Sequence, residues 1–341
     1  MRTEERPLGR LLVTGGAGFI GSAFIRYLLR MPEFSGRIVN LDLLTYAASL
    51  DNLNGFQTHP RYRFIQGDIN NQPLVEKLLE EHEIEAIVHF AAETHVDRSI
   101  ASARPFIEAN VLGTLSLLEA VRRFPHIHFH HISTDEVYGS LGESGSFSEH
   151  SPYRPNSPYS ASKAASDHLV RAFAQTYQIS TTLSHCSNNY GPNQFPEKFV
   201  PLMILHCLTG KPLPVYGRGA NIRDWLYVDD HADAVWTILK HGKKGQTYDI
   251  GGGTEISNLE LLHLLIDTLT KETKTDPERY RSLIRFVEDR PGHDYRYSID
   301  ASKIDNELDW KPKMLLQEGL VRTIRWYLKR TVARSPIGAS K

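Results

Sequence analysis

Short apolar runs alternate with longer amphipathic stretches along the first half of the chain. The runs LLVT, RIVNLD, YRFIQGD and EAIVHFAA have the length and composition of buried strands, and HFHHIS is a further one. Apolar residues recur at helical spacing in FIGSAFIRYLL, LVEKLLEEH, IEANVLGTLSLLEAVRR and YSASKAASDHLVRAFAQTY. Strands and helices that alternate in this way predict an α/β fold with a doubly wound parallel sheet.

The pattern changes after about Ser187. Pro-rich loops such as NNYGPNQFPEKFVP and KPLPVYGRG break the alternation and indicate a smaller mixed α/β lobe, which we expect to bind substrate. WLYVDDHADAVWTILK and TYDIGGG then return to the helix and strand pattern of the first lobe. We therefore expect one domain at 1–187 plus about 225–252, a second at about 188–224 plus 253–330, and a flexible tail at 331–341.

Composition and charge argue against several classes of function. The 341 residues carry a formal net charge of -1, whereas binding to nucleic acid or to an anionic membrane favours a basic protein. No apolar run approaches the ~20 residues that span a bilayer, and the first residues, MRTEERPLGR, lack the apolar core of a signal peptide. Two cysteines, Cys186 and Cys207, are too few for a disulfide framework. We expect a cytoplasmic protein.

A glycine-rich segment, TGGAGFIGS, follows the first predicted strand directly and leads into a helix. Gly15, Gly18 and Gly21 let the backbone approach a pyrophosphate, and the free amides at the start of the helix attract that anion. Such glycines also serve ordinary turns, but their position between strand and helix favours a Rossmann-type dinucleotide site.

Acidic residues at the ends of the next two strands bear on the choice of cofactor. Asp42 can accept hydrogen bonds from an adenosine ribose and would repel a phosphate, and Leu43 and Leu44 follow it instead of an arginine. NAD is therefore expected rather than NADP. Asp68, in GDIN, either faces the adenine or forms an Asx turn, and both interpretations stay open.

Two further segments carry candidate catalytic groups. YSASK places Tyr159 and Lys163 on one face of a helix, where a lysine near a phenol, together with a positive nicotinamide ring, would favour the phenolate and make the tyrosine a base near neutral pH. Thr134, Asp135 and Glu136 follow a strand at the carboxyl edge of the sheet. Two carboxyls in different protonation states suit a reaction that removes one proton and delivers another. A solvated helix face and a helix cap are the structural alternatives.

Longer motifs extend over nearly the whole chain: TGGAGFIGS, LTYAASL, HFAAETHVDRSI, FHHISTDEVYGS, SPYSASKAASDHLVRAF, CSNNYGPNQFPEKFVPLMI, KPLPVYGRG, IRDWLYVDDHA, YDIGG, DRPGHDYRYSIDASKI and WKP. Together they resemble the dTDP-glucose 4,6-dehydratases of the extended short-chain dehydrogenase/reductase superfamily. STDEVYG is the most specific, because a related 4-epimerase ordinarily lacks its Asp-Glu pair. Thr94, Ala109 and GGGTE depart from the usual family pattern, and Ala109 lacks a hydroxyl expected at that position.

The resemblance implies a complete reaction. Tyr159 would take the proton of the glucose 4-hydroxyl as a hydride passes from carbon 4 to NAD, assisted by Lys163 and Thr134. Glu136 would then remove the carbon 5 proton, Asp135 would protonate the departing 6-hydroxyl, and the hydride would return to carbon 6. This assignment requires Asp135 to be protonated at neutral pH, which burial beside Glu136 would achieve.

The resemblance also implies the residues that bind the two ligands. The expected cofactor contacts are Gly15, Gly18, Phe19, Ile20, Gly21, Asp42, Asp68, Ile69, Ala91, Tyr159, Lys163 and Asn189. The expected substrate contacts are Thr94, Thr134, Asn188, Lys198, Phe199, Pro214, Val215, Tyr216, Arg223, Asn258, Arg290 and His293. HVDRS, with Asp97, Arg98 and Ser99, is expected near the site without individual roles.

Other readings of the sequence stay open beside this one. A nucleotide-sugar 4-epimerase, a dehydratase of another nucleotide-hexose and a non-catalytic NAD-binding protein are the alternatives. The family further implies a homodimer formed by the helices at 106–123 and 161–175. Alternation in a strand would place three of the histidines His126, His128, His130 and His131 on one face, but no cysteine or carboxylate cluster accompanies them, so no metal is expected.

Overall fold

The computed structural model describes residues 6–334 and is organised around one seven-stranded parallel sheet. The strand order is β10-β6-β5-β4-β1-β2-β3, and it reverses between β1 and β4. Ligands of open α/β sheets bind at the carboxyl ends of the strands beside such a reversal. The strands are β1 (Arg10–Thr14), β2 (Arg37–Asp42), β3 (Tyr62–Gln66), β4 (Ala86–His89), β5 (His128–Thr134), β6 (Ser180–Cys186) and β10 (Thr247–Ile250).

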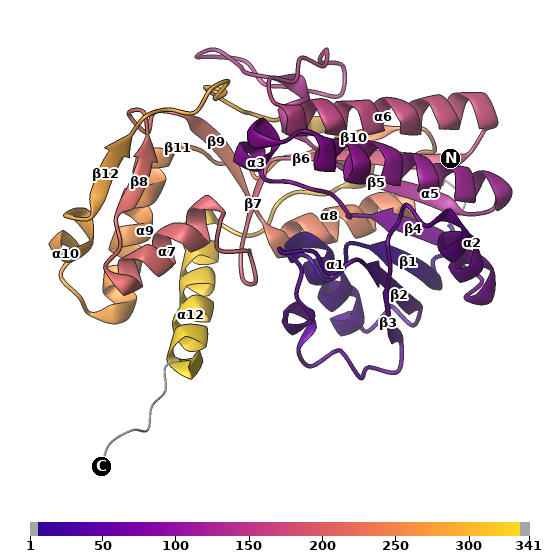
Figure 1. Ribbon diagram of the computed structural model, residues 1–341, viewed down its shortest axis with the longest axis horizontal. Helices are drawn as coiled ribbons and strands as arrows, with labels where there is room; N and C mark the ends of the chain where they lie inside the picture. The colour runs from indigo at the N-terminus through magenta and orange to yellow at the C-terminus, as the bar shows by residue number, and fades with distance from the viewer. Residues whose placement is uncertain (1–5, 335–341) are drawn as a thin grey trace.

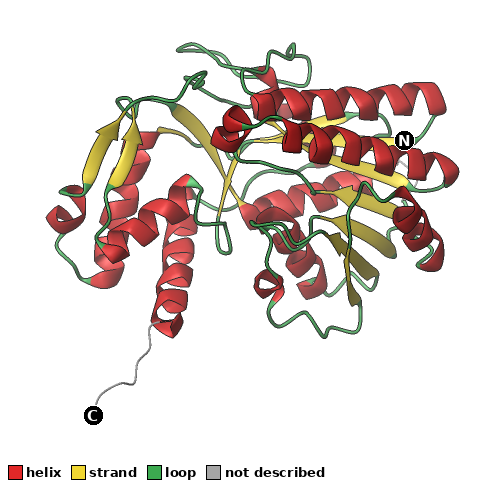
Figure 2. Cartoon of the chain, viewed as in Figure 1, coloured by secondary structure: helices red, strands yellow, loops and turns green. Residues whose placement is uncertain are grey.

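Helices cover both faces of this sheet, as the doubly wound prediction requires (Figures 1 and 2). Successive side chains of a strand point to opposite faces, so Leu12 packs with the helices of one layer and Leu11 and Val13 with those of the other. The first layer contains α2 (Gln72–Glu81), α5 (Gly113–Arg123) and α6 (Pro158–Tyr177). The second contains α1 (Phe19–Arg30) and α8 (Val228–His241), which pack on each other.

The helix expected from IEANVLGTLSLLEAVRR is present but begins irregularly. Short helices α3 (Val96–Ala101) and α4 (Arg104–Phe106) precede a π-helical stretch, η2 (Ile107–Leu112), that continues into α5. Buried Asn110 lies in this stretch and donates hydrogen bonds to the Glu93 carbonyl and the Ser162 hydroxyl. π-helical turns are frequent next to functional sites.

A smaller lobe with its own apolar core lies beside the large sheet, at the left of Figure 1. Its three-stranded sheet has the order β11-β9-β7, and β8 pairs with β12. Leu261, Leu265, Leu320 and Ile324 are fully buried in its core. Its elements are β7 (Asn188–Tyr190), α7 (Phe199–Thr209), β8 (Leu213–Tyr216), β9 (Ile222–Tyr227), β11 (Glu255–Ser257), α9 (Asn258–Thr273), α10 (Pro277–Arg281), β12 (Ile284–Val287) and α12 (Leu316–Arg334).

Two segments bear on the expected domain boundaries. Helix α11 (Ser302–Leu308) contacts β10 and α8 of the large sheet, and Trp310 is buried in the same cluster. Helix α12 continues to Arg334, so the tail expected from residue 331 is helical over its first residues, and 335–341 lie outside the described residues. The division into two domains remains a prediction.

The histidines around β5 do not lie as the alternation suggests. His126 is exposed before the strand begins, so the prediction of three histidines on one face is wrong. His128 and His130 share one face, where each pairs with the Thr182 hydroxyl at 2.8 Å. Within residues 6–334 no three metal-binding side chains are grouped closely enough to hold a metal ion.

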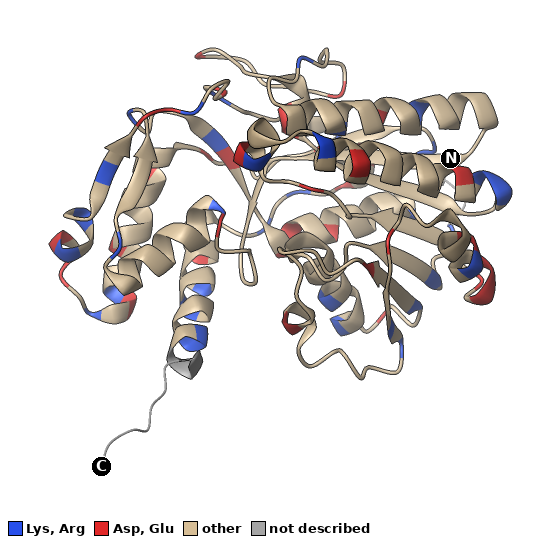
Figure 3. Cartoon of the chain, in the orientation of Figure 1, with Lys and Arg blue, Asp and Glu red and all other residues tan. Residues whose placement is uncertain are grey.

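Two further properties concern the molecule as a whole. Acidic and basic residues are distributed along the ribbons of both lobes (Figure 3). No helix in the described part of the chain has the length and apolar character needed to cross a membrane.

Candidate active site

A cavity of about 500 Å³ opens at the carboxyl ends of the strands, where the order of the sheet reverses. It is lined by the β1–α1 turn, the ends of β2, β4 and β5, helix α6 and the loop after β6. Most of the predicted site residues meet there: Gly15, Gly18, Phe19, Ile20, Gly21, Asp42, Asp68, Ile69, Ala91, Thr94, Thr134, Asp135, Glu136, Tyr159, Lys163, Asn188, Asn189 and Lys198.

The glycine turn has the geometry of a phosphate site. Gly15 adopts a φ of +71°, and a Cβ there would lie 2.5 Å from the Ala91 nitrogen. A Cβ at Gly21 would lie 2.4 Å from the Gly15 carbonyl oxygen, so helix and strand approach closely only because both residues are glycine. Gly18 caps α1 without a side-chain hydrogen bond, and the first turn of α1 has no acidic residue. The amides at this helix start can therefore receive an anion.

Two aspartates border the same part of the cavity. Asp42 accepts hydrogen bonds from the amides of Ala17 (2.9 Å) and Leu44 (2.8 Å), and burial raises its pKa in spite of them. Asp68 accepts from the Asn70 amide at 2.8 Å, so it forms the Asx turn and also lines the cavity. The turn alone does not exclude an adenine contact, because a carboxylate has further acceptor sites.

Helix α6 places Tyr159 and Lys163 on the cavity wall. The helix begins with Pro158 and a capping box between Ser157 and Ser160, which holds Tyr159 in its first turn. Both side chains are buried. The Lys163 ammonium donates to the Ile132 carbonyl at 2.8 Å, and burial lowers the pKa of Lys163 to about 8.

Without the positive charge of a cofactor, the surroundings of Tyr159 favour its neutral phenol. Burial, and then the charge of Glu136, raises the pKa of Tyr159 well above its ordinary value, and a hydrogen bond with Thr134 acts in the opposite direction. In the protein without cofactor, Lys163 by itself does not offset these effects on the pKa of Tyr159. Further positive charge is needed before Tyr159 can act as a base near neutral pH.

Adjacent carboxyls at the end of β5 have different surroundings. The Thr134 hydroxyl caps the following turn, η3 (Asp135–Tyr138), by accepting from the Glu136 amide. Asp135 is buried, and its Oδ2 atom has no hydrogen-bond partner. Burial and then Glu136 raise the pKa of Asp135 well above its ordinary value. Burial and the unpartnered Oδ2 atom therefore favour the protonated form of Asp135, the form that the reaction implied by the sequence requires.

Glu136 faces positively charged side chains from the segments that follow β6. Burial raises the pKa of Glu136, whereas Arg290, Lys198 and Arg223 act to lower it. The two neighbours therefore differ in their surroundings: Asp135 is buried with one carboxyl oxygen lacking a partner, whereas Glu136 faces three cations. Two carboxyls whose environments push their pKa values apart can divide acid and base roles.

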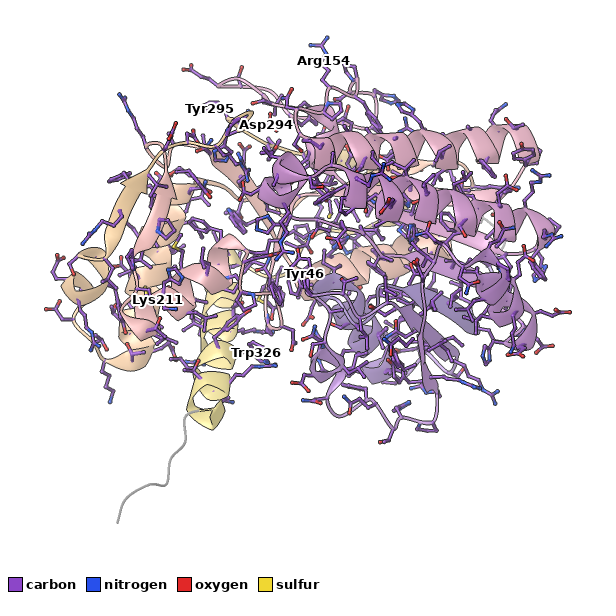
Figure 4. The ribbon with its side chains drawn as sticks, viewed as in Figure 1. Tyr46, Arg154, Lys211, Asp294, Tyr295 and Trp326 are labelled. Carbon is purple, nitrogen blue, oxygen red and sulfur yellow. The ribbon has the colours of Figure 1, made fainter. Side chains whose placement is uncertain are left out.

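The remaining predicted substrate residues lie outside the cavity wall. Arg223 donates to the carbonyls of Asp294 (2.9 Å) and Tyr295 (3.2 Å), two residues labelled in Figure 4. The Val215 side chain is buried in the core of the smaller lobe, so Val215 can meet a ligand only through its backbone. The predicted residues that do not line the cavity are Phe199, Pro214, Val215, Tyr216, Arg223, Asn258, Arg290 and His293.

Some of these outer residues contact one another or the HVDRS segment. Arg290 pairs with Asp97 at 3.6 Å, and His293 pairs with Asp289 at 2.6 Å. The ring of His293 also lies edge-on to Tyr216, 6.1 Å between centroids. These residues form an outer group, and the charge of Arg290 acts from this group to lower the pKa of Glu136.

A set of contacts at the cavity rim was not expected from the sequence. The Tyr46 hydroxyl donates to Glu197 at 2.9 Å, and the Arg98 guanidinium lies over the Tyr46 ring at 3.6 Å. His95 lies 3.7 Å and Arg98 lies 3.8 Å from Glu197. We call Tyr46, His95, Arg98 and Glu197 the rim clasp, and Figure 4 places Tyr46 between the two lobes. Glu93, Cys186 and Gln194 also line the cavity without having been predicted.

Comparisons with known proteins agree with this geometry. Residues 12–323 match the family model described as GDP-mannose 4,6 dehydratase. The dTDP-glucose 4,6-dehydratase of Neisseria gonorrhoeae is 50% identical over 98% of this chain and 99% of its own. The dTDP-glucose 4,6-dehydratase DesIV of Streptomyces venezuelae, solved with NAD bound, is 47% identical, has a TM-score of 0.89 and is matched over 96% of this chain and 100% of its own.

The epimerase alternative is more distant. A UDP-glucose 4-epimerase of Thermotoga maritima shares the fold, with a TM-score of 0.84 over 94% of this chain and 99% of its own, but is 27% identical. The identity to dehydratases extends over almost the full length of both chains, and this chain contains the Asp-Glu pair that its sequence motif led us to expect of a dehydratase. The chain therefore belongs to the dTDP-glucose 4,6-dehydratase family.

Proposed function

We propose that the chain is a hydro-lyase that converts dTDP-glucose to dTDP-4-keto-6-deoxyglucose and water, with NAD as its cofactor. The observation that carries the proposal is the arrangement of Asp135, Glu136 and Tyr159 around one cavity. Asp135 is buried with a free carboxyl oxygen, so it is prepared to donate a proton to a leaving hydroxyl.

The residues around the glycine turn fit NAD. The unoccupied amides at the start of α1 suit its diphosphate, and the Asp42 carboxylate suits an unphosphorylated ribose because it would repel the phosphate of NADP. Bound there, NAD would supply a hydride acceptor for carbon 4 and later a hydride donor for carbon 6. Further contacts are proposed for Phe19, Ile20, Gly21, Asp68, Ile69, Ala91 and Asn189.

Oxidation begins with the 4-hydroxyl. Tyr159 takes its proton, Thr134 orients the hydroxyl, and Lys163 places a positive charge on the same face of α6. The resulting ketone makes the neighbouring carbon 5 hydrogen acidic. A carboxylate is then a strong enough base to remove that proton.

Elimination uses the adjacent carboxyls. Glu136 removes the carbon 5 proton, the electron pair forms the double bond between carbons 5 and 6, and the 6-hydroxyl leaves as water with the proton of Asp135. Hydride addition at carbon 6 and return of the Glu136 proton to carbon 5 complete the product. Tyr159 then has one proton more and Asp135 one fewer, so one proton must pass between them before the next turnover.

The smaller lobe supplies cations for the nucleotide part of the substrate. Lys198, Arg223 and Arg290 all act on Glu136, and guanidinium and ammonium groups bind diphosphates well. Asn188 has a buried carbonyl oxygen without a partner and lines the cavity next to Lys198. We propose substrate contacts for these residues and for Thr94, Phe199, Pro214, Val215, Tyr216, Asn258 and His293.

Product mass tests the proposal directly. Purified protein without added NAD is incubated with dTDP-, UDP-, GDP- and CDP-glucose, and the sugar product is weighed by mass spectrometry. We expect dTDP-glucose to lose one water. An unchanged mass with a changed sugar configuration would identify an epimerase, loss of water from another nucleotide-sugar would reassign the substrate, and no reaction with any of them would contradict the proposal.

We also propose that the enzyme is a homodimer formed through α5 and α6. Large apolar side chains are exposed on and beside these helices, at Ile107 (44%), Leu112 (48%) and Tyr177 (45%). Exposed apolar patches of this kind are typical of protein interfaces.

The state of the cysteines supports a cytoplasmic location, which we propose for the enzyme. Cys186 and Cys207 are both buried and unpaired, and reducing compartments keep thiols in this form. Cell fractionation with an antibody to the chain would test this, and recovery with secreted or periplasmic proteins would contradict it.

A further inference from the structure

A chain of fully buried polar groups lies behind Lys163. Asp167 follows Lys163 by one turn of α6, and its Oδ2 atom accepts hydrogen bonds from Ser133 (2.9 Å) and Tyr153 (3.1 Å). The same oxygen lies 3.1 Å from Nε2 of His185 on β6. Asp167 and His185 have no exposed surface at all.

The chain continues to the edge strand of the sheet. Nδ1 of His185 lies 2.8 Å from Asp249 of β10, and Tyr138 donates a hydrogen bond to the same carboxylate. Burial acts to lower the pKa of His185, but its hydrogen bonds with Asp167 and Asp249 outweigh burial and raise the pKa to about 9. His185 is therefore an imidazolium held between two carboxylates.

The result is a line of buried groups in which Lys163 and His185 are positive and Asp167 is negative. Nε2 of His131 lies between the Lys163 ammonium (3.4 Å) and Oδ1 of Asp167 (3.3 Å), and the Asp249 carboxyl ends the line beside His185. A buried ion without a partner costs several kcal/mol, so each member depends on its neighbours. Burial acts to raise the pKa of Asp167, but hydrogen bonds with His131 and His185 hold it far below its usual range. Asp167 is thus a permanent anion near the catalytic lysine.

The other titratable groups that act on Lys163 or its neighbours are neutral or act elsewhere. Burial and then Lys163 lower the pKa of His131 to about 4, although the Nε2 atom of His131 lies 3.4 Å from the ammonium. Burial also lowers the pKa of His89 well below its ordinary value and raises the pKa of the Cys186 thiol, so both are uncharged. Asp135 and Glu136 of η3 act on Tyr159. Within the described chain, Asp167 is the ionised acid that acts on Lys163.

We propose that Asp167 is a positioning residue that keeps the catalytic Lys163 in its ammonium form, and that His185 and Asp249 hold Asp167 as a carboxylate. Asp167 touches neither cofactor nor substrate in this arrangement; it acts through Lys163. The inference rests on the proposed function, because it assigns the ammonium a role in the action of Tyr159.

Asp167→Asn tests the proposal through the pH dependence of turnover. Without the anion the pKa of Lys163 falls further below its ordinary value, so the alkaline limb of the rate profile moves to lower pH. The phenolate of Tyr159 also loses its partner cation, so the acid limb moves to higher pH. We expect the active pH range to narrow from both sides and kcat at neutral pH to fall at least about tenfold, the factor that corresponds to one pH unit.

A second readout needs no turnover. Ultraviolet difference spectroscopy of the NAD-loaded protein follows ionisation of the Tyr159 phenol, and the matching Tyr159→Phe protein serves as the blank for the other tyrosines. We expect Asp167→Asn to move this titration upward by about one pH unit or more. A phenol titration that falls at the same pH in wild type and in Asp167→Asn would show that Asp167 does not act on the Lys163–Tyr159 pair.

Tyr153→Phe is the matched control. It removes a neutral hydrogen bond to the same oxygen of Asp167 but leaves every charge of the chain in place, so both profiles should stay close to wild type. Asp249→Asn is the second variant, with a smaller shift expected in the same direction, and it supplies the test if Asp167→Asn does not fold by thermal melting.

The possible outcomes separate the two proposals. A folded Asp167→Asn or Asp249→Asn protein with unchanged rate profile and phenol titration would overturn the role of Asp167, as would a shift of equal size in Tyr153→Phe. If the wild-type enzyme does not dehydrate dTDP-glucose, the proposed function fails, whereas the phenol titration still reports whether Asp167 controls the pair.

Discussion

At the scale of single residues, Asp135 and Glu136 show how neighbours in sequence acquire different chemistry. The two residues are adjacent at the end of β5. The Asp135 side chain is buried in the protein, whereas the Glu136 side chain faces the cations of the smaller lobe. Asp135 is 2% exposed and favours its protonated form, while Glu136 is only partly buried. The division of acid and base roles follows from this difference in solvation and charge.

Replacing Glu136 with glutamine should stop the reaction after oxidation. The carbon 5 base is lost while Tyr159 and Lys163 remain, so kcat should fall by about 10²–10⁴-fold. In a single turnover the near-ultraviolet absorbance of reduced nicotinamide should rise and persist. Tyr159→Phe is the comparison, because it should bind NAD but show no such rise. Normal dehydration by Glu136→Gln would place the base elsewhere.

Asp135→Asn should stabilise the protein while it impairs water loss. Burial raises the folded-state pKa of Asp135 above its ordinary value of 3.8, so its contribution to stability is complete below about pH 4 and is lost as the pH rises through the folded pKa. Asparagine does not ionise. At alkaline pH the variant should therefore be about 1–3 kcal/mol more stable than wild type, which is the cost of desolvating such a group. Near pH 3 the stabilities of the variant and the wild type should be closer to each other.

Urea unfolding over a range of pH measures this difference, and mass analysis of the product measures the loss of dehydration. A difference in unfolding free energy that does not change with pH would show that Asp135 is not the neutral acid inferred from its burial. The gain in stability together with the loss of activity would identify a site where function costs stability.

At the scale of elements, the rim clasp connects three segments of the chain across the mouth of the cavity. Tyr46 follows β2, Arg98 belongs to α3, and Glu197 precedes α7. Their contacts join the large sheet to the smaller lobe directly over the region proposed for NAD. We propose that these contacts slow the release of NAD.

Tyr46→Phe should loosen the clasp. Loss of one hydrogen bond to Glu197 should raise the NAD dissociation rate roughly 2- to 10-fold, given the ~0.5–1.5 kcal/mol that such a bond contributes. Stopped-flow displacement of bound NAD measures the rate. Tyr27→Phe is a matched control, because it removes a phenol–carboxylate hydrogen bond to Asp233 between α1 and α8, away from the cavity. Equal rates in the two variants would contradict the proposed role.

At the scale of the whole molecule, η2 and the end of α6 present apolar side chains, Ile107, Leu112 and Tyr177, that the fold itself does not cover. The net charge of -1 leaves little long-range repulsion between two copies.

Leu112→Glu should therefore give a monomer. A charge placed at the centre of an apolar interface is costly to desolvate, so the dimer should weaken at least about a hundredfold. Light scattering after size-exclusion chromatography measures the mass. Leu315→Glu is the control, since Leu315 is 68% exposed in the smaller lobe, and it should leave the mass unchanged. A dimeric Leu112→Glu protein would exclude this face.

Much of the fold and the inner part of the site could be predicted because their signals are local. The strand and helix periods, the spacing of Gly15 and Gly21 and the single helix face shared by Tyr159 and Lys163 depend on residues near one another in the chain. The chain alone therefore determined the parallel sheet and the dinucleotide turn, and it indicated the catalytic groups whose roles we propose.

The tertiary structure decided everything that depends on which distant segments meet. The contact of Tyr46 with Glu197 and the chain from Lys163 to Asp249 exist only because the strand order brings β5, β6 and β10 together and the smaller lobe folds back on α3. It also decided that Val215 lies in a core and that Asp135 favours its protonated form, because burial and pKa are set by the surroundings that packing creates rather than by the residue type.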